Sequence, residues 1–230
     1  MKFDEVAAGQ YPLPVYEPYK STRFRGPLQA PLRVDAPTAT TNAIQFSPAL
    51  VTPIDADLTA HGSAAPLGEK IVVTGRVTDE DGQPVRDSLI EVWQCNSAGR
   101  YFHSRDQHDA PLDPNFFGFG KFLTRHDGRY RFVTIKPAAY PWGNHPNAWR
   151  PAHIHFSLFG NVYAQRLVTQ MYFPGDPLHA LDPIFNSVPD ANARQALVAR
   201  FSIEESVGDV MLGYVFDIVL RGRDATPFDH

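Results

Sequence analysis

The sequence predicts an all-β protein: an antiparallel β-sandwich with an extended proline-rich N-terminal arm and little helix. From Gly68 onward, short segments rich in β-branched and aromatic residues are separated by Gly, Pro, Asp and Asn, which is typical of sandwiches. One segment, ANARQALVARF after the potential N-cap Asp190, has helical character. Nine of the 21 prolines lie within the first 66 residues, where strand and helix patterns are weak.

Residues 1–67 are therefore expected to form an extended arm, and residues 68–230 the sandwich domain. The arm carries Tyr11, Tyr16, Tyr19 and Phe24, which makes it too aromatic for a solvated linker. We expect it to pack on its own domain or on a partner chain. A disordered tail is the alternative.

The strands are expected in chain order as follows. The run KIVVTGRVTDEDGQPVRDSLIEVWQ predicts two β segments joined by a turn at Glu80-Asp81-Gly82. The remaining segments are RYRFVTI (129–135), AHIHFSLFG (152–160), YAQRLVTQMYF (163–173) and GYVFDIVLRG (213–222).

Charge, hydropathy and cysteine content exclude several classes of protein. A net charge of −4 with mixed signs argues against a nucleic-acid or anionic-membrane partner. The N-terminus lacks an apolar signal region and no stretch approaches eighteen apolar residues, so we expect neither secretion nor a membrane span. The single cysteine, Cys95, excludes an internal disulfide and fits a cytoplasmic protein.

The segment WRPAHIHFSLFG contains the pair His153 and His155. Side chains alternate between faces along a strand, so both imidazoles project together while Ile154 points the other way. Two adjacent imidazoles can bind a metal ion. The alternative is a pair of hydrogen-bonded or exposed histidines, because so short a motif is weakly specific.

Further metal ligands could come from two sources. The carboxylates Asp106, Asp109 and Asp113 would give a ferrous site with two histidines and one carboxylate. Alternatively, Tyr101 follows the EVWQ strand and Tyr140 lies between prolines in KPAAYPW. Two phenolates are hard donors that favour a ferric ion. Spacing does not choose between the two sources, since tyrosines at strand ends commonly pack in the core or at its rim.

Five ordered segments carry a family resemblance: GRVTDEDGQPVRDSLIEVWQCNSAGRY, APLDPNF, GRYRFVTIKPAAYPW, WRPAHIHFSLFG and LVTQMYFPGDP. Together they resemble the intradiol ring-cleavage dioxygenases, and within that family the β-type subunits that act on protocatechuate. The similarity is close over residues 68–222 and looser in the arm, through EPYKS. The helical dimerisation region of catechol and hydroxyquinol dioxygenases is replaced here by the proline-rich arm.

The resemblance implies an antiparallel β-sandwich that holds one non-haem Fe(III) per chain through Tyr101, Tyr140, His153 and His155. It implies cleavage of 3,4-dihydroxybenzoate by O₂ to 3-carboxy-cis,cis-muconate, in the β-ketoadipate pathway of aromatic breakdown. A homologous α subunit would complete the active site. The alternatives are an intradiol dioxygenase for another catechol and a metal-free β-sandwich assembly subunit.

The resemblance also implies roles around the metal. Tyr140 would release the metal to take a substrate proton, and Arg150 would stabilise negative charge on the substrate ring. Gln170 would approach the metal-bound oxygen atoms from the next strand. Trp142 and Ile184 match positions in the pocket wall, and Tyr19 the position that contacts the substrate carboxylate. No role maps to His103 or His108, which we expect at the surface or behind the ligands, and Cys95 is expected to pack in the sandwich.

Overall fold

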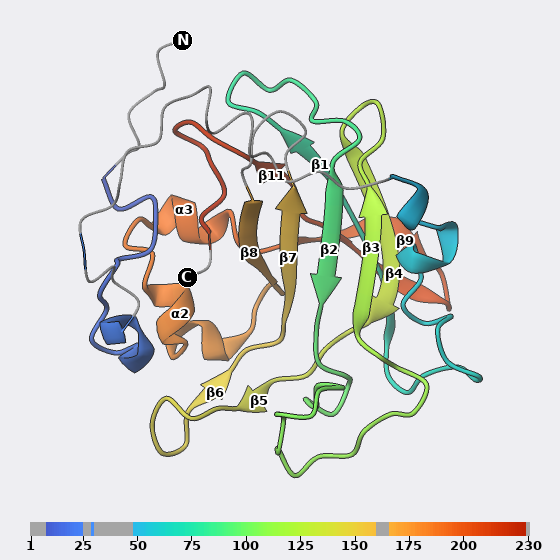
Figure 1. Cartoon of the computed structure of the whole chain (residues 1–230), viewed down its shortest axis with the longest axis horizontal. Coiled ribbons are helices and arrows are strands. Elements are labelled where there is room, and N and C mark those ends of the chain that lie inside the picture. The colour runs from blue at the N-terminus through green and yellow to red at the C-terminus, as the bar shows by residue number, and fades with distance from the viewer. Residues whose placement is uncertain (1–7, 25–28, 30–47, 160–165, 229–230) are drawn as a thin grey trace.

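The computed structural model describes residues 8–24, 29, 48–159 and 166–228, which form two packed β-sheets (Figure 1). The first sheet contains β11 (Ile218–Val219), β1 (Lys70–Thr78), β10 (Met211–Val215) and β9 (Arg200–Val207), with β4 (Arg129–Ile135) also paired to β1. The second runs β3 (Phe119–Leu123), β2 (Leu89–Trp93), β7 (His153–Phe159) and β8 (Arg166–Tyr172). A short ladder joins β5 (Tyr140–Pro141) to β6 (Trp149–Arg150).

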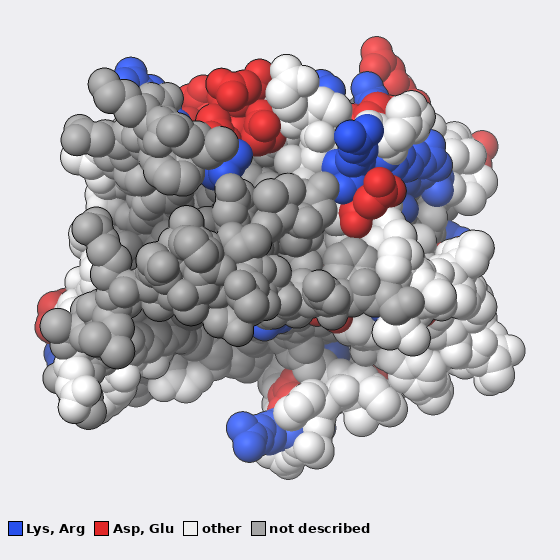
Figure 2. Space-filling view, turned by 45° about the horizontal axis from the view of Figure 1, so that its top comes forward, with Lys and Arg blue, Asp and Glu red and all other residues white. Residues whose placement is uncertain are grey.

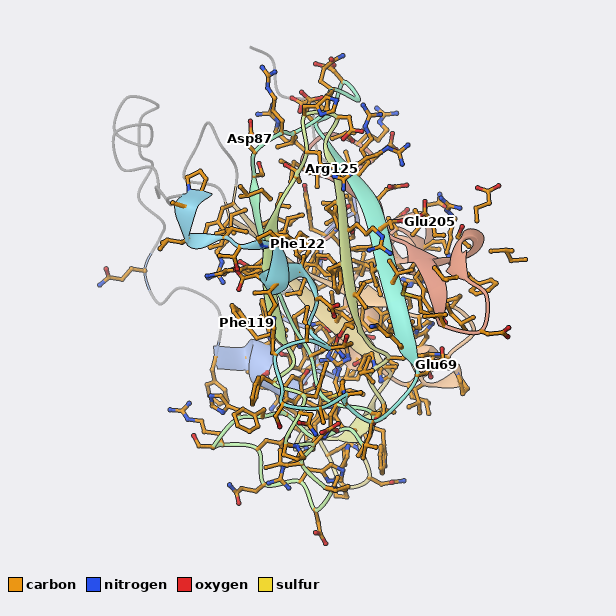
Figure 3. The ribbon with its side chains drawn as sticks, turned by 90° about the vertical axis from the view of Figure 1, so that its right-hand side faces the viewer. Glu69, Asp87, Phe119, Phe122, Arg125 and Glu205 are labelled. Atoms are coloured by element: carbon orange, nitrogen blue, oxygen red, sulfur yellow. The ribbon has the colours of Figure 1, made fainter. Side chains whose placement is uncertain are left out.

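Aromatic and branched side chains from both sheets form the core. Phe132 on β4 stacks against Phe122 on β3 at 5.1 Å between ring centroids and contacts Phe156 on β7 edge-on at 5.9 Å. All three rings are buried. The side view in Figure 3 shows the sheet that carries Phe119 and Phe122 on the opposite side of the molecule from Glu205 on β9. Burial of these rings stabilises the sandwich that carries the site.

The predicted β-sandwich is confirmed, with one difference in strand pairing. The second sheet is antiparallel throughout, as expected. In the first sheet β1 pairs in parallel with both β10 and β11. Parallel neighbours require a long connection, and here it is supplied by most of the sandwich between Thr78 and Met211.

The predicted turn at Glu80-Asp81-Gly82 is present, and Gly82 adopts a φ of 75°. Beyond it, Val85 N–H still donates to the Val77 carbonyl. The chain then crosses to the other sheet at Asp87, whose φ of 55° is unusual for a non-glycine residue. The two segments therefore do not form a hairpin, because β2 pairs with β3 and β7 instead.

Helix is scarce, and the predicted helical segment is shorter than expected. Asp190 caps α3 (Ala191–Gln195) by accepting from the Ala193 N–H at 2.8 Å. The prediction that the helix extends to Phe201 was wrong, because Ala199 bonds to the Tyr172 carbonyl and Phe201 lies in β9. The sequence did not reveal α2 (Pro183–Asn186). In the part of the chain that the structure describes, the other helices are short 3₁₀ segments, at Lys20–Phe24 (η1), Pro48–Leu50 (η2), Pro53–Ala56 (η3) and Pro177–Ala180 (η4).

The described part of the arm, residues 8–24, packs on the chain's own domain. Asn144 holds it from both sides, accepting from Lys20 N–H at 3.0 Å and donating to the Pro18 carbonyl at 2.7 Å. Leu13 N–H donates to the Ser187 carbonyl at 2.8 Å. In Figure 1 this blue segment lies beside α2. The expectation that the arm packs is met for these residues, while residues 1–7, 25–28 and 30–47 lie outside the described part.

Acidic and basic side chains lie close together on the face shown in Figure 2, where coloured atoms of one sign adjoin those of the other. This agrees with the net charge of −4 spread over both signs. Within the described residues, no helix has the length and apolar character required to cross a bilayer.

Candidate metal centre

Three separate segments bring the four expected ligands together at one end of the second sheet. His153 and His155 lie on the same face of β7, while Ile154 between them is fully buried in the core. Tyr140 lies on β5, held opposite Arg150 of β6. Tyr101 follows the turn after β2, and its N–H donates to Asp106 Oδ2 at 2.7 Å.

The donor atoms are close enough to share one ion. The Nε2 atoms of His153 and His155 are 3.2 Å apart, and Tyr140 Oη is 3.3 Å from His153 Nε2. The ring of Tyr101 stands edge-on to that of Tyr140, at 5.4 Å between centroids. Bonds of about 2 Å to a transition metal place neighbouring donors about 3 Å apart. The residues present therefore fit a metal ion.

Both histidines are prepared as neutral ligands. His153 Nδ1 lies 2.7 Å from the Pro151 carbonyl, which can only accept, so the ring proton belongs on Nδ1 and Nε2 keeps its lone pair. Burial and the nearby Arg150 cation lower the pKa of His153 well below its ordinary value. The same two causes lower the pKa of His155 to about 3. A neutral imidazole is the form that binds a metal.

The two phenols are neutral when no cation is near. Burial, and then the neighbouring Tyr140, raise the pKa of Tyr101 well above the ordinary value. Burial likewise raises the pKa of Tyr140, against an opposing effect of Arg150. Tyr101 Oη is also buried, and within the described residues it makes no hydrogen bond of good geometry, although the Tyr140 hydroxyl lies near enough to act on its pKa. Such an atom is costly unless a further partner binds it, and a highly charged cation would both satisfy the oxygen and favour its ionisation.

Two of the three alternative carboxylate ligands are engaged elsewhere, and the third, Asp109, is exposed. Asp106 accepts from the N–H groups of Tyr101 and His108, and Asp113 accepts from those of Leu67 and Asn115. In the described ranges, no group of three or more His, Cys, Asp or Glu side chains is arranged to hold a metal. The geometry thus favours the tyrosines over a site with two histidines and one carboxylate.

Arg150 lies behind the ligands in a buried polar network. Its Nη2 donates to Gln170 Oε1 at 2.5 Å and to Tyr172 Oη at 2.9 Å. Both Nε and Nη2 donate to Asp182 Oδ2, at 3.2 and 3.0 Å. Coulombic interactions with Tyr172 and Asp182 outweigh desolvation and raise the pKa of Arg150 further, so it is a permanent cation.

The expected substrate-contacting residues surround this network. Tyr19, Gln170 and Ile184 line one small pocket between the arm, β8 and α2. Tyr19 is 5% exposed and meets the edge of Trp142 at 5.5 Å between ring centroids. The guanidinium of Arg150 lies 5.7 Å from the centre of the Trp142 ring, within range of a cation–π interaction. Trp142 therefore lies beside Arg150, while Tyr19 and Ile184 line the same pocket as Gln170.

Sequence reasoning missed three residues at this site. Trp93 stacks on His155, Tyr172 joins the Arg150 network, and Asp182 anchors that network. A signal existed for two of them. Tyr172 is two residues from Gln170 on the same strand face, and Asp182 precedes a proline at a helix start.

The remaining expectations concern residues outside the site. His103 is exposed in the loop after Tyr101, and His108 lies further along that loop, partly buried. Cys95 is a buried thiol that donates to the Ala138 carbonyl at 3.3 Å, as expected for a packing residue.

Comparison with known proteins points to one family. Residues 42–222 match the family model described as dioxygenase. The protocatechuate 3,4-dioxygenase beta chain of Burkholderia cepacia is 57% identical over 221 residues, which cover 95% of this chain and 94% of that protein. The alpha chain of protocatechuate 3,4-dioxygenase from Pseudomonas putida is 32% identical, covering 70% of this chain and 76% of that protein.

Solved structures agree with the fold. The dioxygenase domain of a carbohydrate-binding fusion protein from Streptomyces sp. SirexAA-E superposes with a TM-score of 0.52 at 26% identity, covering 72% of this chain and 86% of that one. The 3-chlorocatechol 1,2-dioxygenase from Rhodococcus opacus 1CP superposes with a TM-score of 0.56 at 24% identity, covering 74% and 66%. These neighbours place the sandwich among dioxygenase folds.

Proposed function

The chain belongs to the intradiol dioxygenase family, and we propose that it is the iron-bearing β-type subunit of an enzyme that cleaves protocatechuate with O₂ to 3-carboxy-cis,cis-muconate. The observation that carries this proposal is the convergence of two imidazoles and two phenols beside a buried arginine: His153 Nε2 lies 3.2 Å from His155 Nε2 and 3.3 Å from Tyr140 Oη, and the Tyr101 ring contacts that of Tyr140. The 57% identity to a beta chain of that activity supports the choice of substrate.

Tyr101, Tyr140, His153 and His155 would hold one non-haem ferric ion. Two anionic oxygens and two neutral nitrogens form a donor set that stabilises Fe(III) over Fe(II). When bound, this ion would act as the Lewis acid that orients the two hydroxyl oxygens of a catechol. The Tyr101 oxygen supports this donor set, because it is buried and makes no hydrogen bond of good geometry within the described chain.

Arg150, Tyr140 and Gln170 have different roles around the metal ligands. Arg150 keeps a permanent positive charge in a water-poor site, where it stabilises negative charge that develops on the substrate ring. Tyr140, as the phenolate that it would be on the metal, would accept a substrate proton; its oxygen lies 3.3 Å from His153 Nε2, whose lone pair is directed to the same site. Gln170 lies opposite His155 in the β7–β8 pairing, and its side-chain oxygen would hold the Arg150 guanidinium beside the ligands.

Recognition of the substrate carboxylate falls to the arm and to a partner. We assign residues 1–67 as an arm and residues 68–230 as the domain that carries the iron. Tyr19 would donate its hydroxyl to the carboxylate, with Trp142 and Ile184 forming apolar walls. A homologous α subunit would close the pocket. The similarity of this chain to an alpha chain supports a partner built on the same fold. A single buried thiol suits the cytoplasmic location that we propose.

One experiment tests the proposal as a whole. The chain is expressed with and without its α partner, loaded with iron, and assayed for O₂ uptake with protocatechuate, catechol and hydroxyquinol. We expect a red protein, because tyrosinate-to-ferric charge transfer absorbs visible light, with highest kcat/KM for protocatechuate and little activity without the partner. A higher kcat/KM for another catechol would change the assigned substrate. A colourless iron-loaded protein would refute the ferric site and would favour the alternative of a metal-free assembly subunit.

A further inference from the structure

Asp182 is a fully buried carboxylate whose two oxygens serve different parts of the site. Oδ2 accepts from Nε and Nη2 of Arg150, at 3.2 and 3.0 Å, and lies 3.2 Å from Tyr172 Oη. Oδ1 accepts from Ile184 N–H at 3.1 Å and so caps the first turn of α2. One side chain thus connects the arginine to the helix that carries a pocket wall.

The arginine is held from one side only. Its Nε and Nη2 atoms are engaged by Asp182, Tyr172 and Gln170, while Nη1 donates to no residue in the described part of the chain. The side chains of Arg150 and Asp182 are 4% and 0% exposed, so water cannot replace either partner. A guanidinium fixed by two of its nitrogens keeps a defined plane and leaves the third nitrogen available.

We propose that Asp182 is the positioning residue of this site. It sets the plane of the Arg150 guanidinium so that Nη1 remains for the substrate, and it fixes Ile184 at the pocket wall through the cap of α2. Asp182 itself does not touch the substrate. This inference rests on the proposed role of Arg150. It adds that Asp182 links the position of the arginine to helix α2.

The competing explanation is that Asp182 only caps a short helix. Asparagine separates the two, because it is as good an N-cap as aspartate. In Asp182→Asn the oxygen that accepts from Ile184 N–H is retained. The atom facing Arg150 becomes an NH₂ group, which is a donor placed against donors. A capping role alone would survive this change, and a positioning role would not.

The experiment uses the iron-loaded complex with its partner and compares Asp182→Asn, Arg150→Ala and the double variant. We expect Asp182→Asn to keep its iron content and visible absorption while kcat falls about ten- to a hundredfold, since small misplacements of a charge have effects of this size. The double variant should lose no more turnover than Arg150→Ala alone, because Asp182 acts through the arginine. The control is Asp190→Asn, the cap of α3, which contacts no arginine of this network and should retain wild-type kcat.

A second readout does not depend on activity. Arg150→Ala leaves the Asp182 carboxylate buried and unpaired, which is strongly destabilising. We therefore expect the metal-free double variant to unfold at a higher temperature than metal-free Arg150→Ala. If Asp182 only capped α2, adding Asp182→Asn to Arg150→Ala would leave the melting temperature unchanged.

The outcomes separate this inference from the proposed function. Wild-type turnover in Arg150→Ala would refute the role of the arginine itself. Loss of turnover in Arg150→Ala with wild-type kcat in Asp182→Asn would overturn the positioning inference alone. If Asp182→Asn fails to fold, Tyr172→Phe removes one partner of Arg150 without disturbing the cap. It should lower kcat a fewfold, and an unchanged kcat there would also overturn the inference.

Discussion

Trp93 and His155 lie directly opposite each other on β2 and β7, and their rings stack with centroids 4.8 Å apart and planes 2° from parallel. The stack restricts rotation of the imidazole about its side-chain bonds. His153, by contrast, is oriented by a hydrogen bond to the Pro151 carbonyl. The two imidazoles of the pair are thus fixed by different means.

We expect Trp93→Leu to weaken iron retention about tenfold, because groups that orient a metal ligand typically contribute at this level. Iron content after timed exposure to a chelator measures the effect. Trp149→Leu changes a tryptophan that is 40% exposed and should retain iron as the wild type does. Equal iron loss from both variants would mean that the stack does not orient His155.

The ligand assignment predicts that Tyr101→Phe, Tyr140→Phe, His153→Ala and His155→Ala each lower iron affinity by about a hundredfold or more. The sandwich should stay folded, since the donor atoms lie at one end of the sheet and outside the core. Metal analysis, visible absorption and circular dichroism are the measurements. Normal iron content and colour in any one variant would remove that residue from the ligand set.

Arg150→Ala should keep iron and colour yet lose kcat by about a hundredfold or more, as when a fixed donor to developing charge is removed. The charge acts on the substrate and not on the metal. Arg131→Ala, at an exposed position of β4, provides the matched control and should retain full turnover. A wild-type kcat for Arg150→Ala would reduce Arg150 to a structural ion-pair partner of Asp182.

Tyr19→Phe should raise KM for protocatechuate about tenfold, the effect of removing a hydrogen bond to a charged group. KM for unsubstituted catechol should change little, because catechol has no carboxylate. Steady-state kinetics on both substrates, with iron content as a check, measure the difference. Tyr16→Phe, in the same arm but outside the pocket lining, should affect neither substrate. Equal impairment on both substrates would argue that Tyr19 only packs.

Cys95 should be inert in the folded protein. Burial raises the pKa of its thiol to about 12, so the reactive thiolate is scarce at pH 8. We expect negligible labelling by a thiol reagent until the chain is unfolded. Because the folded pKa is raised, this thiol favours folding below about pH 9, and its contribution is lost as the pH rises toward 12. Rapid labelling of the native protein would contradict the burial.

The sequence alone determined the fold class and the pairing of the histidines. Period-two alternation requires His153 and His155 to share a face, whatever the rest of the chain does. Turn chemistry likewise placed the bend at Gly82, and Asp190 marked the start of α3. Strand limits such as 129–135 followed from the pattern to the residue. All of these depend on interactions between residues close together in the chain.

The tertiary structure decided which distant residues meet. Nothing local to β1 shows that its partners are β10 and β11, more than a hundred residues later. The same holds for Tyr101, Tyr140 and the histidine pair, whose spacing left carboxylate ligands equally open. Asp182 meets Arg150 only because the segment between β8 and α2 returns to β6, which brings charges 32 residues apart to 3.0 Å. Burial then makes that pairing obligatory, since neither charge can turn to water.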